Sequence, residues 1–248
     1  MSKKRRTRNL TTLIVAMIFL AVCLPSWSAS KKAAANVIDA GTFDIMIGGK
    51  KVATETFEIS QQTDFSLAKG TLKTEDGSKE SQSYDLEMLP SGNLRHYEWN
   101  ESGASKGQST VEPQNDFLVQ HINSATLPKP VEQPYVLPPS TAVLDDYFFS
   151  QRELLLWRYL GTNCAKQTDK GCPMPKTNFG VIVPRQRNSM SVSIEFKGRE
   201  KLLLRGKEVE LSRFQMHTEA DDWSLWMDDQ YKLQRVLVES DQTEVIRE

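Results

Sequence analysis

The chain has few of the residues and motifs on which most enzyme active sites depend. It holds three histidines, His96, His121 and His217, which lie far apart in stretches that each predict a strand. HExxH zinc pairs, GxxxxGK[ST] phosphate loops and GxGxxG dinucleotide loops are absent, and we expect no nucleophile elbow. We therefore predict no catalytic residue, no metal and no cofactor, and we expect a protein that is not an enzyme.

Cysteine is also scarce, with three among 248 residues. Cys23 lies in an apolar N-terminal leader, so the rest of the chain retains Cys164 and Cys172. A single pair around a polar, glycine-containing loop predicts a disulfide in an oxidising compartment. The spacing differs from the C-x-x-C of a redox or zinc pair, and no histidine lies nearby in the sequence.

An excess of positive charge is missing once the leader is set aside. Residues 1–30 contain five basic residues, an apolar stretch at 10–24 and small residues after Pro25, which predicts a signal peptide. The alternative is an uncleaved membrane anchor, although the stretch is shorter than the roughly 20 apolar residues of a spanning helix. Removing the five bases from 31 Lys+Arg leaves 26 against 32 Asp+Glu, a net charge of −6. This acidic balance argues against a nucleic-acid partner, and we expect a periplasmic or secreted protein with no stable membrane span after signal cleavage.

Short strands separated by turn signals fill residues 37–124. Phe43, Ile45 and Ile47 alternate before Gly48-Gly49, and an extended pattern resumes at 52–59, where we place Glu55 on the solvent side. Further strand patterns follow at 65–73, 83–89, 94–99 and 117–122. Such spacing predicts a first antiparallel meander. Residues 125–140 contain five prolines and predict an extended surface linker.

The densest apolar segment after the leader covers residues 143–160. Ser150 and Glu153 have the spacing of a capping box, which predicts a helix from Gln151 to Leu160 that ends at Gly161. Thr141 or the preceding serine could cap an earlier helical turn. Because the segment is apolar nearly all round, we expect it to be buried on more than one side. Periodicity alone leaves a central strand at 154–160 open as the alternative.

A disulfide loop at 161–176 leads into a second meander at 177–248, whose clearest strand is 190–196. Two meanders and one apolar helix can share one core, so we predict a single β-rich domain at 37–248. The predicted fold class is mainly β with one central helix (α+β). It is a curled antiparallel sheet or half-barrel of about 9–11 strands packed around that buried helix.

Aromatic and acidic side chains supply the remaining candidates for function. Trp99, Trp157, Trp223 and Trp226 could fill the core, or some could line a cavity for an apolar ligand. The ligand-binding candidates are Phe148, Leu155, Tyr159 and Trp226. Neighbouring acids such as Asp145/Asp146 and Asp228/Asp229 could in principle act as glycosidase carboxylates. Adjacent acids on a strand point to opposite faces, however, which counts against that chemistry.

Three stretches together resemble bacterial exported β-barrel families of unknown function: GTFDIMIGGKKVATETFEI, LDDYFFSQRELLLWRYL and SLWMDDQYKLQRVLVES. These families combine a leading hairpin, a central D-x-x-x-S helix segment and a closing tryptophan hairpin. More distantly, the plan is similar to the lipoprotein-carrier superfamily, in which a half-barrel shelters acyl chains against helices. That resemblance implies an apolar ligand, although only one substantial helix is predicted here. It transfers no site residue to this chain.

These observations favour an exported, non-enzymatic envelope protein that binds a lipid or other apolar ligand in a curled sheet. One alternative is a structural or interaction protein of the envelope with a filled barrel. The other is a hydrolase that uses exposed carboxylates. The expected partner is a lipid or an envelope protein.

Overall fold

A computed structural model of the chain describes residues 35–76, 81–103, 106–164, 172 and 174–248. The predicted signal peptide at 1–30 lies outside the described residues. The described elements, in chain order, are β1 (Asn36–Ile47), β2 (Lys50–Gln61), β3 (Ser66–Thr74), β4 (Ser81–Met88), β5 (Leu94–Glu101), β6 (Gly107–Gln114), β7 (Phe117–Ser124), β8 (Val131–Tyr135), β9 (Ala142–Val143), α1 (Ser150–Cys164), β10 (Thr177–Val183), the 3-10 turn η1 (Pro184–Gln186), β11 (Asn188–Leu204), β12 (Lys207–His217), β13 (Asp222–Met227), β14 (Leu233–Val238) and β15 (Thr243–Arg247).

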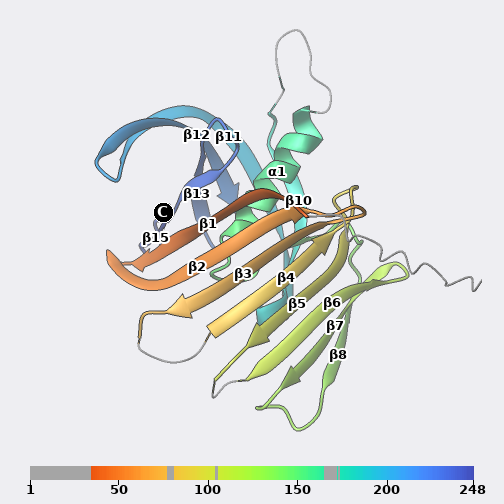
Figure 1. The fold of residues 1–248 in the computed structure, drawn as a ribbon. Coiled ribbons are helices and arrows are strands. Elements are labelled where there is room, and N and C mark those ends of the chain that lie inside the picture. The colour runs from red at the N-terminus through yellow and green to blue at the C-terminus, as the bar shows by residue number, and fades with distance from the viewer. Residues whose placement is uncertain (1–34, 77–80, 104–105, 165–171, 173) are drawn as a thin grey trace, which may run out of the picture. The chain divides into compact units, whose positions relative to one another are not determined.

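The described strands form one continuous sheet of 15 strands in the order β8-β7-β6-β5-β4-β3-β2-β1-β15-β14-β13-β12-β11-β10-β9. The first and last strands pair at its centre, with Phe43 opposite Arg247 and Ile47 opposite Thr243. The first meander, β1–β8, and the second, β9–β15, therefore extend outward from this pair as two arms. Neighbouring strands are antiparallel except β9 and β10, which are parallel. Figure 1 shows α1 between the two arms.

The two arms of the curled sheet meet again at η1. The Gln120 side chain on β7 donates a hydrogen bond from Nε2 to the Pro184 carbonyl oxygen at 2.8 Å. The Arg185 guanidinium lies over the Trp99 ring of β5, 5.1 Å from its centre. The predicted class, a mainly β protein with one helix inside a curled antiparallel sheet, is confirmed.

The sheet has more strands than the roughly 9–11 expected from turn spacing. Strand β6 was missed because two of its three inward positions carry Gly107 and Ser109, and Val111 is its one large apolar side chain there. Strand β8 falls inside the segment predicted to be a linker. It tolerates Pro134 because it is the edge strand of the sheet, where a missing N–H breaks no ladder.

Helix α1 differs from its predicted bounds at both ends. It begins at Ser150 and continues past Gly161 to Cys164, because Gly161 has ordinary helical geometry with open space around it rather than the left-handed conformation of a helix-ending glycine. No earlier helical turn forms, since Ala142 and Val143 instead pair with β10 as β9. A strand through 154–160 is excluded. Among the described residues, no helix has the length and apolarity needed to cross a bilayer.

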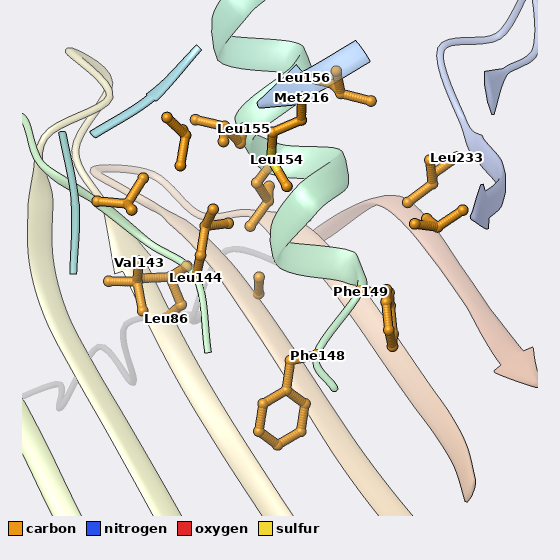
Figure 2. Packing of buried hydrophobic residues seen from close by; sticks show 14 of the residues in the cluster. Leu86, Val143, Leu144, Phe148, Phe149, Leu154, Leu155, Leu156, Met216 and Leu233 are labelled. Atoms are coloured by element: carbon orange, nitrogen blue, oxygen red, sulfur yellow. The ribbon is translucent and has the colours of Figure 1, made fainter. Parts of the chain in front are cut away.

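The buried apolar residues around α1 form one cluster that draws on both arms. Leu154, Leu155 and Leu156 point to successive sides of the helix in Figure 2, and each is at least nine-tenths buried. Leu86 of the first arm and Met216 of the second belong to the same cluster. The expectation that the helix is buried on more than one side is therefore confirmed.

Candidate functional site

A buried carboxylate on the sheet, rather than a capping box, holds the N-terminus of α1. Glu55 on β2 is fully buried and accepts hydrogen bonds from the Phe149 N–H at 2.6 Å and from the N–H and hydroxyl of Ser150. The Ser150 hydroxyl also lies 2.6 Å from the Tyr84 hydroxyl. The predicted solvent position of Glu55 is therefore wrong, and the Ser150 side chain bonds to the sheet instead of to Glu153.

A second carboxylate secures the loop before the helix. Asp145 is fully buried and accepts hydrogen bonds from the Tyr97 hydroxyl and from the Arg185 N–H at 2.9 Å. Its own N–H donates to Gln151 Oε1 at 2.6 Å. Arg152 donates from Nη1 to the carbonyl oxygens of Asp145 and Phe148. Asp145 thus binds both arms to the start of α1 and is not an exposed catalytic acid.

A third group of charges lies on another side of the helix. Arg247 on β15 donates to Asp39 Oδ1 on β1 at 2.7 Å and lies 3.5 Å from Glu153 on α1. Lys232 Nζ approaches the same Asp39 oxygen at 2.8 Å. Asp39, Glu153 and Arg247 are each more than nine-tenths buried. A Cβ on Gly41 would approach the Arg247 guanidinium to 2.9 Å, so this guanidinium occupies the space above a glycine.

Burial changes the protonation of these acids. It raises the pKa of Glu55 to about 7 and that of Asp145 to about 6, even though hydrogen bonds to each carboxylate act in the opposite direction. Burial and the adjacent Asp39 raise the pKa of Glu153 to about 9. Burial alone would raise the pKa of Asp39, but hydrogen bonds from Arg247, Glu153 and Lys232 outweigh it and lower that pKa. Glu153 is therefore protonated at neutral pH beside an ionised Asp39.

The four buried acids fix the helix inside the sheet, and each is almost fully shielded from solvent. Within the described ranges, no group of three or more His, Cys, Asp or Glu side chains could hold a metal ion. The arrangement is that of an internal framework, because each acid binds chain segments far apart in the sequence.

An open cleft lies along one face of this anchored helix. It has a volume of about 780 Å³ and runs between α1 and the ends of the first-arm strands and β9. Its apolar lining consists mainly of Ile59, Leu86, Met88, Leu94, Val143, Leu154, Leu155 and Trp157. Ile38 and Leu89 also line it and are 48% and 39% exposed, so apolar surface continues to the rim. The helix contributes Gln151, Leu155 and Arg158 at the spacing of one helical face.

A smaller cleft of about 500 Å³ lies between α1 and the second arm. Arg152, Phe149 and Trp223 line it together with several acids, including Asp146 and Asp241. The Arg152 guanidinium lies 4.9 Å from the centre of the Trp223 ring. The mixed charge of this lining distinguishes it from the apolar cleft on the other side.

The structure does not bring the four predicted ligand-binding residues together. Leu155 lines the apolar cleft. Phe148 is enclosed in the core against Tyr84, with ring centres 4.7 Å apart, and Tyr159 is enclosed against Phe214. Trp226 donates to Glu200 at 3.0 Å, and Arg213 and Arg235 lie over its ring; neither it nor these partners line the cleft.

The remaining polar candidates lie apart from the cleft. His96, His121 and His217 occupy β5, β7 and β12 and each lies next to a different carboxylate. Asp228 caps its own turn through the N–H groups of Gln230 and Lys232.

Residues 103–107 read G-A-S-K-G, so the letters of the nucleophile-elbow motif do occur, contrary to expectation. They join β5 to the antiparallel β6, with residues 104 and 105 outside the described part, whereas an elbow requires a strand-to-helix turn.

Cys164 and Cys172 form a disulfide in the structure, with Cα atoms 4.8 Å apart. Cys164 is the last residue of α1, so the bond joins the end of the helix to the segment leading to β10. Residues 165–171 between them lie outside the described part.

Sequence reasoning missed Glu55, Asp39 and Arg247. The two-residue alternation along each strand places all three on the inward face. Glu55 shares its alternation with Phe57 and Ile59, and Arg247 shares its alternation with Val245. Glu55 is predicted to face solvent because charges are rarely buried unless they are paired, and no position is predicted for Asp39 or Arg247. The partners that bury these three side chains, Ser150 for Glu55 and Glu153 and Asp39 for Arg247, lie more than 90 residues away in the sequence.

Comparisons with known proteins give a fold but no activity. No protein-family model and no curated protein matches the chain. Among solved structures, the chain is similar to the crystal structure of a β-barrel-like protein of the domain of unknown function DUF1849 from Brucella abortus. The TM-score is 0.52 and the sequence identity 5%, over 87% of this chain and 97% of that one. The chain therefore has the fold of a β-barrel-like protein of unknown function.

Proposed function

We propose that this protein is an exported, non-enzymatic protein of the cell envelope that holds a lipid or other apolar ligand in the cleft beside α1. The observation that carries the proposal is the cleft itself. Its volume of about 780 Å³ lies within the range of roughly 300–1,000 Å³ that is typical of small-molecule sites. Its lining is mainly apolar, and apolar side chains continue to its rim.

The buried framework supports this proposal because a binding cleft needs a fixed wall. Glu55 and Asp145 hold the first turn of α1 against both arms, so the face that carries Leu155 keeps its position when the cleft is empty. The predicted signal peptide and the disulfide pair agree with an oxidising, extracytoplasmic location.

A structural or interaction protein is the second candidate, and the closely packed half of the interior favours it. Phe148 and Tyr159 are fully buried, Phe148 against Tyr84 and Tyr159 against Phe214. A protein of this kind would need its packed core but would have no use for the cleft. A substitution that fills the cleft therefore distinguishes the two functions, because only ligand binding requires the cleft.

The test uses the uncharged dye N-phenyl-1-naphthylamine, whose fluorescence rises in an apolar environment. Delipidated protein is expected to bind it saturably. The variant Met88→Trp places a larger side chain in the cleft lining, and it is expected to weaken binding at least about tenfold. Leu203→Trp is the matched control, since Leu203 is 72% exposed and lies outside the cleft.

Both variants are compared with the wild type by circular dichroism and thermal melting. If wild-type protein shows no saturable dye binding, the proposed function is wrong. It is also wrong if Met88→Trp folds normally and binds the dye as well as the Leu203→Trp control does.

A further inference from the structure

The apolar cleft contains one charged side chain among the lining residues that the structure describes. Arg158 lies on the face of α1 that also presents Leu154 and Leu155, and no carboxylate occurs among the described lining residues. A lone cation in an otherwise uncharged and mainly apolar lining favours a ligand that carries a negative charge.

The Arg158 side chain has no ion pair or hydrogen bond with any residue in the described part of the chain. Its guanidinium carbon lies 5.8 Å from the centre of the Phe179 ring, at the long end of the cation–π range. Among the other buried or half-buried arginines that the structure describes, Arg235 pairs with Glu244 and Arg247 with Asp39, each at 2.7 Å. Arg152 instead donates to backbone carbonyl oxygens, and Arg185 lies over the Trp99 ring. Partial burial without a counter-charge also lowers the pKa of Arg158.

The cleft has a deep end and an open end, and Arg158 lies toward the open end. Gln151, the second residue of α1, is almost fully buried, whereas Gly161 and Thr162 near its C-terminus are exposed. Seven residues of helix place Arg158 about 10 Å from Gln151 along the axis. A chain lying against Leu154 and Leu155 would therefore reach the guanidinium near the open end.

We infer that the ligand of this cleft is a single-chain anionic amphiphile whose oxyanion headgroup, a carboxylate or a phosphate, pairs with Arg158. The guanidinium fork binds either headgroup through two parallel hydrogen bonds, and the apolar lining receives the alkyl chain. The inference rests on the proposed function and narrows it from apolar ligands in general to those with one negative headgroup.

Displacement of the bound dye by a matched series of ligands tests the inference. Palmitate and palmityl phosphate carry the headgroup, and palmityl alcohol has the same chain without the charge. Both anions are expected to bind wild-type protein at least about tenfold more tightly than the alcohol. A preference for one anion over the other identifies the headgroup.

Variants at Arg158 assign that preference to the residue. Arg158→Gln should remove the advantage of the anions and leave binding of palmityl alcohol within about twofold, whereas Arg158→Lys should retain part of it. Arg95→Gln is the matched control, since Arg95 also lies over an aromatic ring, that of Phe65, and is outside the cleft. If Arg158→Gln does not fold, the comparison of anion and alcohol on wild-type protein still tests whether the cleft prefers an anionic headgroup.

The outcomes separate the two claims. Equal affinity for alcohol and anions in the wild type overturns the charge inference and leaves the proposed function standing. An anion preference that survives Arg158→Gln also overturns it. If neither the dye nor any member of the series binds, the proposed function is wrong, and the charge inference that rests on it is wrong as well.

Discussion

The carboxylate of Glu55, on the second strand of the sheet, accepts hydrogen bonds from the N–H and the hydroxyl of Ser150, 95 residues later, at the first turn of the single described helix. An acceptor at a helix N-terminus is favourable because the first N–H donors have no partner within the helix. Here the sheet provides the acceptor oxygens from inside the core, and Glu55 thereby holds the N-terminus of α1.

Replacing Glu55 with alanine should destabilise the protein by about 3 kcal/mol, because three buried donors on Phe149 and Ser150 lose their acceptor. Chemical denaturation at pH 6 measures this loss. Glu58→Ala on the same strand is the matched control, since Glu58 is exposed, and it should change stability by less than about 0.5 kcal/mol. A loss at Glu55 no larger than that at Glu58 would show that the carboxylate does not hold the helix.

The raised pKa of Glu55 predicts that stability falls as the pH rises. The unfolded chain releases this proton near pH 4.5 and the folded chain near pH 7, so between these values the folded state binds more protons. Stability contributed by the protonated group is fully present below pH 4.5 and is lost up to about pH 7, by about 3 kcal/mol. Asp145 acts in the same direction from pH 3.8 to about 6.

Denaturation of wild type and Glu55→Gln at pH 5 and pH 8 measures this contribution. The glutamine variant should show a distinctly smaller decrease, because its side chain does not titrate. Equal decreases in the two proteins would rule out a titrating Glu55.

Replacing either of two glycines with alanine should change the stability of the protein, in opposite directions for the two positions. A Cβ on Gly70 would lie 2.3 Å from the Tyr84 ring, so Gly70→Ala must displace that ring and should cost about 1–3 kcal/mol. Gly161, within α1, has open space around it, and Gly161→Ala should stabilise the protein by about 0.5–1 kcal/mol. Thermal melting of both variants provides the comparison. A neutral Gly70→Ala would mean that Tyr84 is not packed against this strand.

Arg247 joins β15 to β1 and to the helix, and its loss leaves buried acids without their cation. Arg247→Met should destabilise the protein by about 3–5 kcal/mol. The double variant Arg247→Met, Asp39→Asn should recover part of that loss, because the ionised partner is removed together with the cation. Lys201→Met, which breaks an exposed ion pair with Glu208, is the control and should have little effect. Additive losses in the double variant would show that Asp39 and Arg247 are not coupled.

Local patterns predicted the mainly β class, the single helix and its burial on several sides, since alternation and an apolar segment depend on neighbouring residues. They did not predict how the helix is held. Ser150 and Glu153 have capping-box spacing, yet both side chains bind strands 94 or 95 residues away, and pairings at that distance are not encoded in local spacing. Strand β6 was missed for a similar reason, because Ser109 faces inward to bond Gln120 rather than to fill space.

The candidate site was only partly visible in the sequence. Leu155 was predicted to face a ligand and does line the cleft, whereas Phe148 and Tyr159 on nearby turns are enclosed by Tyr84 and Phe214. Periodicity identifies the apolar sides of a helix but not which side meets a protein wall and which meets open space. Arg158 was not singled out because an arginine in a helix ordinarily pairs at the surface.

Native mass spectrometry of the full chain, purified gently and never delipidated, tests the central claim most directly. We predict a species with one bound long-chain molecule, recovered by solvent extraction and absent from Met88→Trp but present in Leu203→Trp. A wild-type protein that shows only its polypeptide mass, and that after delipidation takes up no alkyl ligand saturably, would contradict the account.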